Sequence, residues 1–564
     1  MFLIKYIPNQ NWSTQPSKLS GYTNQIILSG NNWDDYGSKT SFNMIVVLNN
    51  KEYKNWAVRI LIEGESYSAA YLDKLCNEGW DGVFPIPNKN YISQFSDIDF
   101  YKTLVSVLEI EQINKILINF KDASYMKNIE KDVSILHLIE NSIFTESLLR
   151  DTGSHKAFEE AWMLFEDNIS SSINDFCFNY KDKKNEIKNI FFNFSKQLLP
   201  TDINVLIGAN GVGKSHTIKV LSEYLLKVGE GDVRRLEGYQ PFDRRPNFSN
   251  LILTSYSVFE DFLVDLSDEN IKENEKENYK YFGLRARDVD NKNRIAIGRN
   301  IPSLDAKKAV FKMIYENYQY KNLNWWVDKL GLAKETLKKA FDFDELVIGV
   351  NEQADFSLIS EYDYYHFNGK KYLILNEKLE NFEVIHHSVK FENTIFFLKN
   401  NKIIKLSSGQ KIFSYIVLNI LGEIKESSLI IIDEPELFLH PTLEIEFIGL
   451  LKSILEPFKS KAILATHSLS IVREVPSSCV HIYKENELGL SIESPPFQTF
   501  GGDMQRISTY VFGDSLLKKP YENFLNTLLD SKKFTPTQLI DELGEAVNEE
   551  MIMDIKIWES LNGN

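Results

Sequence analysis

The pattern of apolar and polar positions divides the chain into regions of different character. In the first hundred residues, short apolar runs at 26–28, 44–48 and 58–62 are separated by Gly, Asn, Asp and Ser. Short runs bounded by such turn residues are typical of β-strands. We therefore predict a β-rich α+β N-terminal module over residues 1–105, followed by a helical connector over residues 106–170.

Within residues 171–500, strand-like apolar runs alternate with helical stretches from about residue 204 to about residue 485. The run 203–207, for example, is followed by a helical pattern over residues 216–228. Such alternation indicates a mostly parallel sheet with helices on its faces. We predict an α/β fold here, with a helical insert at about 306–345, and an acidic helical tail over residues 501–564.

A glycine-rich turn follows the run 203–207. Its sequence, from Gly208 through Asn210, Gly211 and Gly213 to Lys214 and Ser215, fits the pattern G-x-x-x-x-G-K-[ST]. Glycines let backbone N–H groups approach phosphate oxygens, and the following helix adds its N-terminal dipole. Lysine at this position reaches the β- and γ-phosphates, and the hydroxyl after it holds Mg²⁺. With strand and helix on either side, a chance glycine turn is the poorer interpretation.

Two later apolar runs end in side chains suited to phosphate chemistry. The run 429–432 ends in Asp433 and Glu434, and the run 462–465 leads to His467. Carboxylates at the carboxyl edge of a parallel sheet suit a Mg²⁺ ligand and a general base. A solvated acidic turn and a structural histidine are the plain alternatives. The order and spacing of the two runs favour a catalytic base and a γ-phosphate sensor.

A fourth segment, Ser407-Ser408-Gly409-Gln410, stands just before a helical pattern and about two dozen residues before Asp433. Alone it is an ordinary helix N-cap followed by a glycine. Its interest lies in its position relative to the other segments.

Together, the four segments resemble the ordered motifs of ABC-type ATPases over about residues 175–490. The stretch from Asp433 to Pro441, which reads Asp-Glu-Pro-Glu-Leu-Phe-Leu-His-Pro, is similar to the OLD-like and SMC/RecF-like branch. At the family level the resemblance extends to ATPase subunits of bacterial anti-phage systems such as Septu and the retron-associated ATPases.

The resemblance implies ATP and Mg²⁺ as cofactors and two heads packed head-to-tail around ATP. It implies nucleotide binding by Asn210, Gly211, Gly213, Lys214, Ser215, His216, Ser407, Gly409 and Gln410. Metal binding falls to Ser215, Asp433 and Thr254, and catalysis to Glu434 and His467. Ser407 and Gly409 would act on the nucleotide of the opposite subunit, so a complete site needs a homodimer or a related partner.

Two positions depart from the family pattern. The glutamine that usually ends the strand after the first helix is replaced, so that Thr254 or Ser255 fills its place. A hydroxyl can orient Mg²⁺-bound water there. Ser408 stands where glycine is more common, and its Cβ narrows the approach of the backbone.

Charge changes this picture in one respect. The 564 residues carry a net charge of -16, which argues against a protein that coats nucleic acid without regard to sequence.

Three separated cysteines indicate a reducing compartment, and no apolar stretch is long enough to cross a bilayer. The expected location is the cytoplasm, without membrane association.

Arginine is concentrated in one part of the chain. Eight of the 12 arginines fall between residues 234 and 299, and the candidates for contact with nucleic acid are Arg234, Arg235, Arg244, Arg245, Arg285 and Arg287. Three interpretations stay open: contacts with nucleotide or subunit, a local nucleic-acid groove, and ordinary salt bridges with the acidic stretch 260–277.

The expected function is an ATP-hydrolysing switch of a bacterial anti-phage complex that gates a separately encoded effector, such as a nuclease or toxin. The residues after His467 contain no Asp-x-Asp pair, so they do not fit the nuclease domain of OLD-type proteins. The alternatives are a RecF-like DNA repair clamp and a scaffold that ATP stabilises without hydrolysis.

Overall fold

The structure is a computed structural model. It describes residues 2–562 except 9–15, 32–37, 54–55, 166–172, 183, 196–197, 233–238, 268–277, 289–293, 351–363, 377–378, 380–389, 487–488, 514–519 and 532. The chain forms two compact units, Met1–Phe500 and Gly501–Asn564. Among the described residues, no helix combines the length and the apolar character that crossing a membrane requires.

The N-terminal part of the first unit is built on a six-stranded sheet with the order β1-β2-β3-β5-β6, in which β4 pairs with β3. The strands are β1 (Phe2–Tyr6), β2 (Asn24–Gly30), β3 (Ser41–Leu48), β4 (Lys51–Tyr53), β5 (Ala57–Ile62) and β6 (Tyr91–Phe95). Helix α1 (Ser68–Asn77) follows β5. Burial of both faces of β3 and β5 explains their nearly continuous apolar runs.

The helices after β6 share one apolar core with this sheet. They are α2 (Ile98–Val107), α3 (Ile110–Phe120), α4 (Ala123–Tyr125), α5 (Val133–Ile139) and α6 (Thr152–Glu160). The stretch expected to be a connector is therefore packed into the N-terminal module. From here on, "N-terminal module" means the sheet together with α1–α6.

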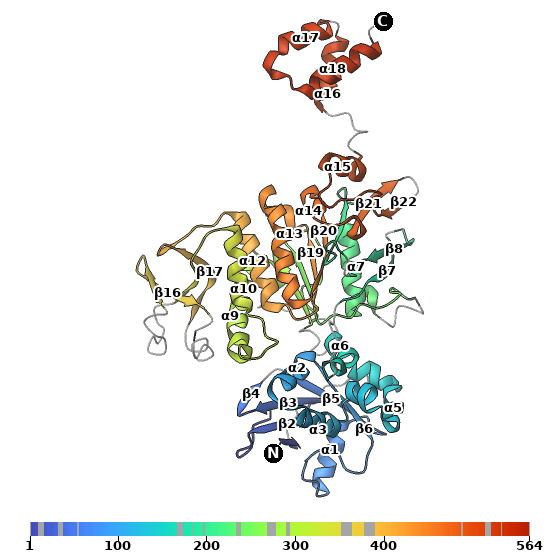
Figure 1. Ribbon diagram of the computed structural model, residues 1–564, viewed down its shortest axis with the longest axis vertical. Helices are drawn as coiled ribbons and strands as arrows, with labels where there is room; N and C mark the ends of the chain where they lie inside the picture. The colour runs from blue at the N-terminus through green and yellow to red at the C-terminus, as the bar shows by residue number, and fades with distance from the viewer. Residues whose placement is uncertain are drawn as a thin grey trace. The chain divides into compact units, whose positions relative to one another are not determined.

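A seven-stranded sheet with the order β11-β10-β19-β20-β9-β21-β22 forms the centre of the first unit, and only β22 pairs antiparallel. The strands are β9 (Ile203–Gly208), β10 (Leu251–Ser255), β11 (Tyr279–Gly283), β19 (Leu429–Asp433), β20 (Lys461–Thr466), β21 (Val480–Asn486) and β22 (Gly489–Glu493). Helix α7 (Lys214–Leu226) covers one face, and α12 (Ser408–Glu423) and α13 (Pro441–Leu455) cover the other (Figure 1).

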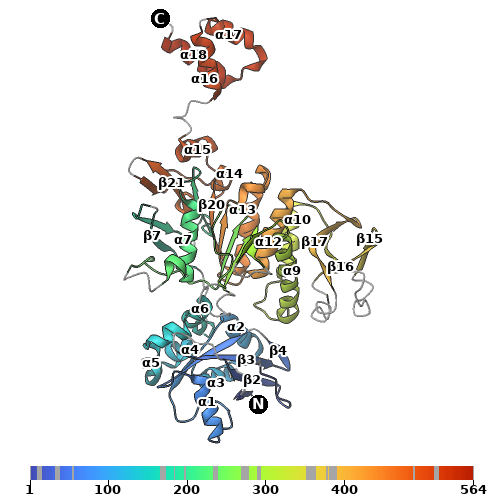
Figure 2. The same ribbon diagram turned by 180° about the vertical axis from the view of Figure 1, so that it is seen from behind.

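The stretch 306–345, predicted to be a helical insert, is largely helical, and the insert continues past it as a sheet. Helices α9 (Ile301–Tyr320) and α10 (Lys329–Ala340) lead into a five-stranded antiparallel sheet, β15-β16-β14-β17-β18, beside the central sheet (Figure 2). Its strands are β14 (Glu345–Val350), β15 (Tyr364–Phe367), β16 (Lys370–Leu375), β17 (Phe391–Lys399) and β18 (Lys402–Ile403). Strict strand–helix alternation from 204 to 485 was thus the wrong prediction for this stretch. A short apolar run does not reveal which sheet it joins.

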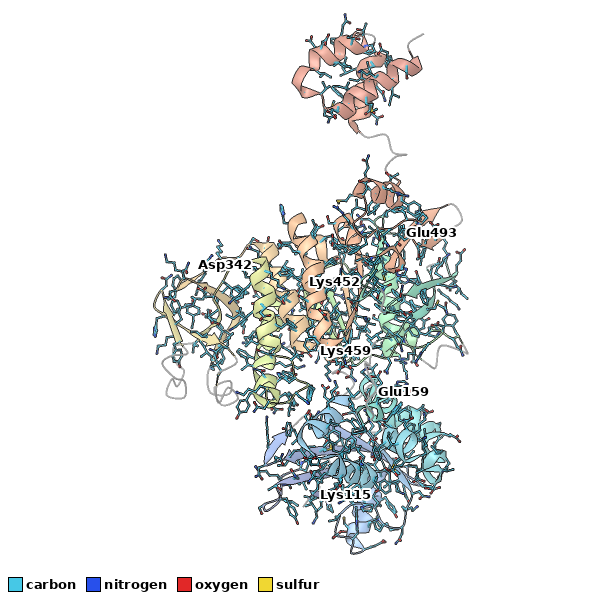
Figure 3. All side chains as sticks on the ribbon, in the orientation of Figure 1. Lys115, Glu159, Asp342, Lys452, Lys459 and Glu493 are labelled. Carbon is cyan, nitrogen blue, oxygen red and sulfur yellow. The ribbon has the colours of Figure 1, made fainter. Side chains whose placement is uncertain are left out.

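The second unit is helical, with α15 (Met504–Phe512), α16 (Pro520–Asp530), α17 (Pro536–Leu543) and α18 (Glu549–Asn562). Leu525, Leu529, Leu539 and Ile555 form its small apolar core. The side chains of both units are drawn in Figure 3.

Candidate nucleotide-binding site

The phosphate loop joins β9 to α7. β9 is buried along its whole length, and a Cβ at Gly208 would lie 2.5 Å from the carbonyl oxygen of Tyr483 on the neighbouring strand. Gly211 and Gly213 have φ values of 81° and 105°, a region that favours glycine. Gly213 precedes the first turn of α7, whose N–H groups have no intrahelical acceptor. The loop therefore presents backbone donors and a helix N-terminus at one place, as an anion site requires.

Lys214 is buried behind this loop. Its Nζ atom donates to the carbonyl oxygens of Gly208, at 3.0 Å, and Ala209, at 3.1 Å, and lies 2.9 Å from Nε2 of His467. Burial lowers the pKa of Lys214 to about 8, although the carboxylates of Glu434 and Asp433 oppose the shift. The cation is thus held next to the loop at a cost that a bound phosphate would offset.

Ser215 and Asp433 form the second contact of the site. The Ser215 hydroxyl donates to Oδ1 of Asp433 over 3.1 Å. Burial raises the pKa of Asp433 well above its ordinary value, and the nearby carboxylates of Glu260 and Glu434 add to the shift. Among the described residues, Oδ2 of Asp433 is a buried atom with no hydrogen-bond partner. A hydroxyl and a carboxylate oxygen without a partner are ligands that suit Mg²⁺.

Glu434 and His467 complete the cluster. Oε1 of Glu434 lies 3.4 Å from Nε2 of His467, and this contact lowers the pKa of Glu434. Glu434 itself has a left-handed backbone, with φ 48°, which turns the chain sharply after β19. The backbone N–H of His467 donates to Oε1 of Glu436 over 2.5 Å. The strand-end histidine therefore lies between a cation and a carboxylate, and Glu436, which we did not single out from the sequence, holds its backbone.

The strand register favours Ser255 over Thr254 as the residue beside the candidate metal site. In the register of β10 and β19, Thr254 is paired with Ile432 and Ser255 with Asp433. Because paired residues of neighbouring strands face the same side, Ser255 shares the face of Asp433 and Thr254 faces the other way. Both hydroxyls are buried, and among the described residues neither has a hydrogen-bond partner. Ser255 is the better candidate for orienting water near the metal site.

Glu260 is a further acidic residue near the cluster. It follows β10 by five residues, and its carboxylate contributes to the pKa shifts of both Asp433 and Lys214. Its only signal in the sequence is an acidic side chain shortly after a strand that lacks the usual glutamine. That signal was too common to single out.

The signature segment stands apart from the cluster. Ser407 caps α12, its hydroxyl accepting from the N–H of Gln410 over 3.3 Å while the Gln410 side chain accepts from the N–H of Ser407 over 3.0 Å. Ser407 and Ser408 are exposed and Gly409 is buried. In the described part of the chain, no hydrogen bond or ion pair joins these residues to the phosphate loop. Asn210 and Gly211 are exposed in the loop, and His216 is the third residue of α7.

The described arginines are mostly engaged within the chain. Arg285 donates to the carbonyl oxygen of Glu260 and lies 3.5 Å from Asp261, and Arg287 binds Asp265 through Nε, at 2.8 Å, and Nη2, at 2.7 Å. Arg245 donates to the carbonyl oxygen of Leu225 over 2.5 Å.

For Arg285 and Arg287, the salt-bridge interpretation therefore applies. Arg244 is exposed. Arg234 and Arg235 lie outside the described residues.

Comparison with known families agrees with this geometry. Residues 203–473 match a family model described as "AAA domain, putative AbiEii toxin, Type IV TA system". The matched range contains the phosphate loop, the acidic strand end and His467, whose side chains the fold has brought into contact. This part of the chain is therefore similar to P-loop ATPase domains, in its sequence and in the contacts of its phosphate loop.

Among individual proteins, the chain is similar to Protein ea59 of Escherichia phage lambda, with 23% identity over 519 residues and 90% of each chain covered. It also resembles the SmcHead bound to the C-winged helix domain of ScpA, with 14% identity, 58% of this chain and 98% of that chain covered, and a TM-score of 0.31. For cbiO1 of Clostridium perfringens the identity is 15%, the coverage 60% and 91%, and the TM-score 0.25. Because these TM-scores are low, the similarity to an ATPase domain rests on the family match and on the contacts around the phosphate loop.

Proposed function

We propose that the protein is an ATP-hydrolysing switch in which two copies pack head-to-tail around two nucleotides. One observation carries the proposal. Lys214, Ser215, Asp433, Glu434 and His467 are linked by contacts of 3.4 Å or less, whereas Ser407 is exposed at a helix N-terminus. A helix N-terminus that faces solvent suits the phosphates of a second copy. Each ATP would then lie between the loop of one chain and the α12 N-terminus of the other.

The residues divide the chemistry among them. Lys214 and the loop N–H groups would bind the phosphates, while Ser215 and Asp433 would hold Mg²⁺, which would supply charge stabilisation. Glu434 accepts a proton from the attacking water. His467, within reach of both Lys214 and Glu434, positions that carboxylate and contacts the γ-phosphate.

We further propose that the switch acts in conflict between bacteria and phages and controls a separate effector such as a nuclease or toxin. Two observations support this role: the description of the matched family names a toxin of a toxin–antitoxin system, and one relative is a phage protein. Purifying the tagged chain together with the products of neighbouring genes tests for the effector. A chain that binds DNA tightly with ATP and without any partner would favour a repair clamp instead.

Mixing two inactive variants tests the shared site. Lys214→Ala removes the phosphate-binding cation. Ser407→Asp keeps a good helix N-cap but places a negative charge where the partner's phosphates would lie. Each variant alone should lose ATPase activity. Random pairing makes half of the dimers mixed, each with one intact site of two, so the mixture should recover roughly a quarter of the wild-type rate.

A mixture that stays as inactive as its components would contradict the shared site. Full activity of Ser407→Asp alone would do the same, because it would mean that α12 does not contact nucleotide. A matched control is Thr535→Asp, which makes the same kind of change at the capping box of α17, where no nucleotide is proposed to bind.

A further inference from the structure

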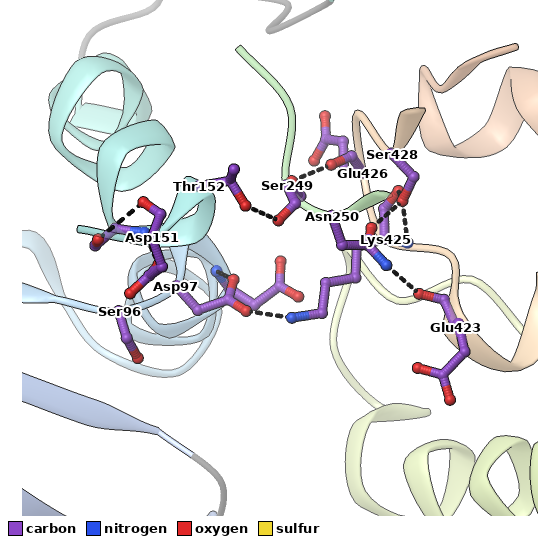
Figure 4. Close-up of polar contacts among 12 residues, drawn as sticks. Ser96, Asp97, Asp151, Thr152, Ser249, Asn250, Glu423, Lys425, Glu426 and Ser428 are labelled. Atoms are coloured by element: carbon purple, nitrogen blue, oxygen red, sulfur yellow. Dashed lines mark hydrogen bonds and ion pairs between the residues drawn. The ribbon is translucent and has the colours of Figure 1, made fainter. Parts of the chain in front are cut away.

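The end of α12 and the start of β19 form a corner that rests on the N-terminal module. We call residues 423–428 the corner segment. Lys425 of this segment is paired with Asp97 over 2.6 Å (Figure 4), and the neighbouring Glu426 is paired with Lys102 of α2. Asp97 also caps α2, accepting from the N–H of Asp99 over 3.0 Å. Two opposite pairs of charges thus fasten the corner to the first helix after β6.

Further hydrogen bonds tie the corner segment to the start of β10. The Ser249 hydroxyl donates to the carbonyl oxygen of Glu426 over 2.5 Å, and the Asn250 amide donates to that of Glu423 over 2.9 Å (Figure 4). The Thr152 hydroxyl of α6 donates to the carbonyl oxygen of Ser249 over 3.1 Å. The N-terminal module therefore contacts the amino ends of two neighbouring strands through one continuous polar network.

The nucleotide-facing residues lie at the opposite edge of the same sheet. Because β19 runs from the corner segment to Asp433, and α12 runs from Ser407 down to the corner segment, both elements connect the corner to the ATP site. The 16 residues of α12 span about 24 Å. A displacement of the corner is therefore carried to Ser407 and Asp433 by two stiff elements.

The contact has open space beside it. A cavity of about 500 Å³ lies beside it, lined by charged residues, among them Asp97, Lys102 and Lys425, and by aromatic ones such as Trp325. Although burial opposes the charge of each group, Asp97 raises the pKa of Lys425 and Lys425 lowers the pKa of Asp97. Charged pairs beside a cavity can exchange partners without the repacking that an apolar interface demands.

We propose that Lys425 and Asp97 are positioning residues of the ATPase site: by fastening the corner segment to the N-terminal module, they set the rate of ATP hydrolysis at the far edge of the sheet. The inference rests on the proposed function, since it names the regulation of that site. Neither residue touches nucleotide, so the pair acts on turnover and not on the binding of ATP to one chain.

The test compares kcat, KM and the Kd of a fluorescent ATP analogue for the full chain. Asp97→Asn keeps the cap of α2 but removes the charge, and Lys425→Met keeps the length of the side chain. Each should lower kcat about 5- to 10-fold, corresponding to roughly 1 kcal/mol, with KM and Kd within twofold of wild type. The double variant, Asp97→Asn with Lys425→Met, should lose no more than either single variant, because both changes remove the same contact.

The control is Lys399→Met, which breaks a 2.5 Å ion pair with Asp342 in the insert and should leave kcat unchanged. A wild-type kcat in both single variants, whatever their melting temperatures, would overturn the inference and leave the pair with a structural role only. A double variant that is slowed by the product of the two single effects would also overturn it. A wild-type chain without ATPase activity would instead overturn the proposed function, and this inference with it.

Discussion

The ammonium of Lys214 lies 2.9 Å from Nε2 of His467, and the same nitrogen lies 3.4 Å from the carboxylate of Glu434. With a lone pair on Nε2 the imidazole accepts from Lys214, and with a proton there it donates to Glu434. One ring nitrogen is thus shared between the phosphate-binding cation and the general base. A bound phosphate that moves Lys214 away from His467 would therefore also change the surroundings of Glu434.

The low pKa of Lys214 predicts that ATP affinity depends on pH. Without nucleotide the ammonium loses its proton near pH 8, well below the ordinary 10.5, because burial disfavours the charge. A bound triphosphate favours the charged form, so affinity should fall above pH 8 by up to about tenfold per pH unit. Equilibrium titration with a fluorescent ATP analogue at pH 7, 8 and 9 measures the effect.

Lys214→Arg is the control, because a guanidinium stays charged over this range. Its affinity should be nearly independent of pH, whatever its absolute value. The pKa shift of Lys214 also determines the direction in which the stability of the folded chain changes with pH. Between pH 8 and 10.5 the unfolded chain binds more protons at this residue, so its contribution to the stability of the nucleotide-free protein rises with pH.

Glu434→Gln should separate nucleotide binding from hydrolysis. The amide keeps the size of the side chain but accepts no proton, so we expect kcat to fall at least about 100-fold. ATP should then hold the two copies together, which light scattering with ATP and with ADP can detect. Glu444→Gln, which changes a carboxylate bonded to Ser468 outside the cluster, is the matched control. Unchanged hydrolysis in Glu434→Gln would remove this residue from the role of base.

Gly208→Ala should destabilise the protein because the new Cβ would lie 2.5 Å from a backbone oxygen of β21 that cannot easily move. We expect a loss of about 1–3 kcal/mol in the free energy of unfolding, measured in urea. Gly449→Ala gives the opposite case, since this exposed helical glycine has no atom within 4 Å of a built Cβ. It should gain about 0.5–1 kcal/mol. Equal effects of the two changes would contradict the close approach of β9 and β21.

Replacing Arg244 should affect DNA binding, whereas replacing Arg287 should affect stability. Arg244 is exposed, so Arg244→Glu should weaken binding to duplex DNA and make the slope of log affinity against log salt shallower by about one for each phosphate it had neutralised. Arg287 is bound by Asp265 in a bidentate pair, so Arg287→Ala should lower stability by about 1 kcal/mol without changing DNA binding. Binding by Arg244→Glu that matches wild type across a salt titration would remove the nucleic-acid role.

The parts of the site that were predictable from the sequence are those that a short motif places by itself. Lys214 and Asp433 each follow a buried strand, so their meeting at one sheet edge follows from parallel pairing. The choice between Thr254 and Ser255 cannot be predicted in this way, because a shift of one residue in the strand register decides which face of the sheet a side chain takes.

Other features depend on contacts between segments far apart in the sequence. The pairing of Lys425 with Asp97, 328 residues apart, leaves no local pattern in the sequence. The antiparallel sheet of the insert is a similar case. Its apolar runs are ordinary strands, and only their partners distinguish that sheet from the central one.

The hairpin made by α12 and β19 has a consequence for what the proposed dimer can sense. In the proposed dimer, β19 of each chain would end at that chain's own nucleotide and α12 would begin at the nucleotide of the other copy, while both elements meet at the corner segment. The position of the corner segment against the N-terminal module of each copy would then depend on both nucleotides. The contact between the module and the corner segment would therefore reach its ATP-bound arrangement only when both nucleotide sites are filled.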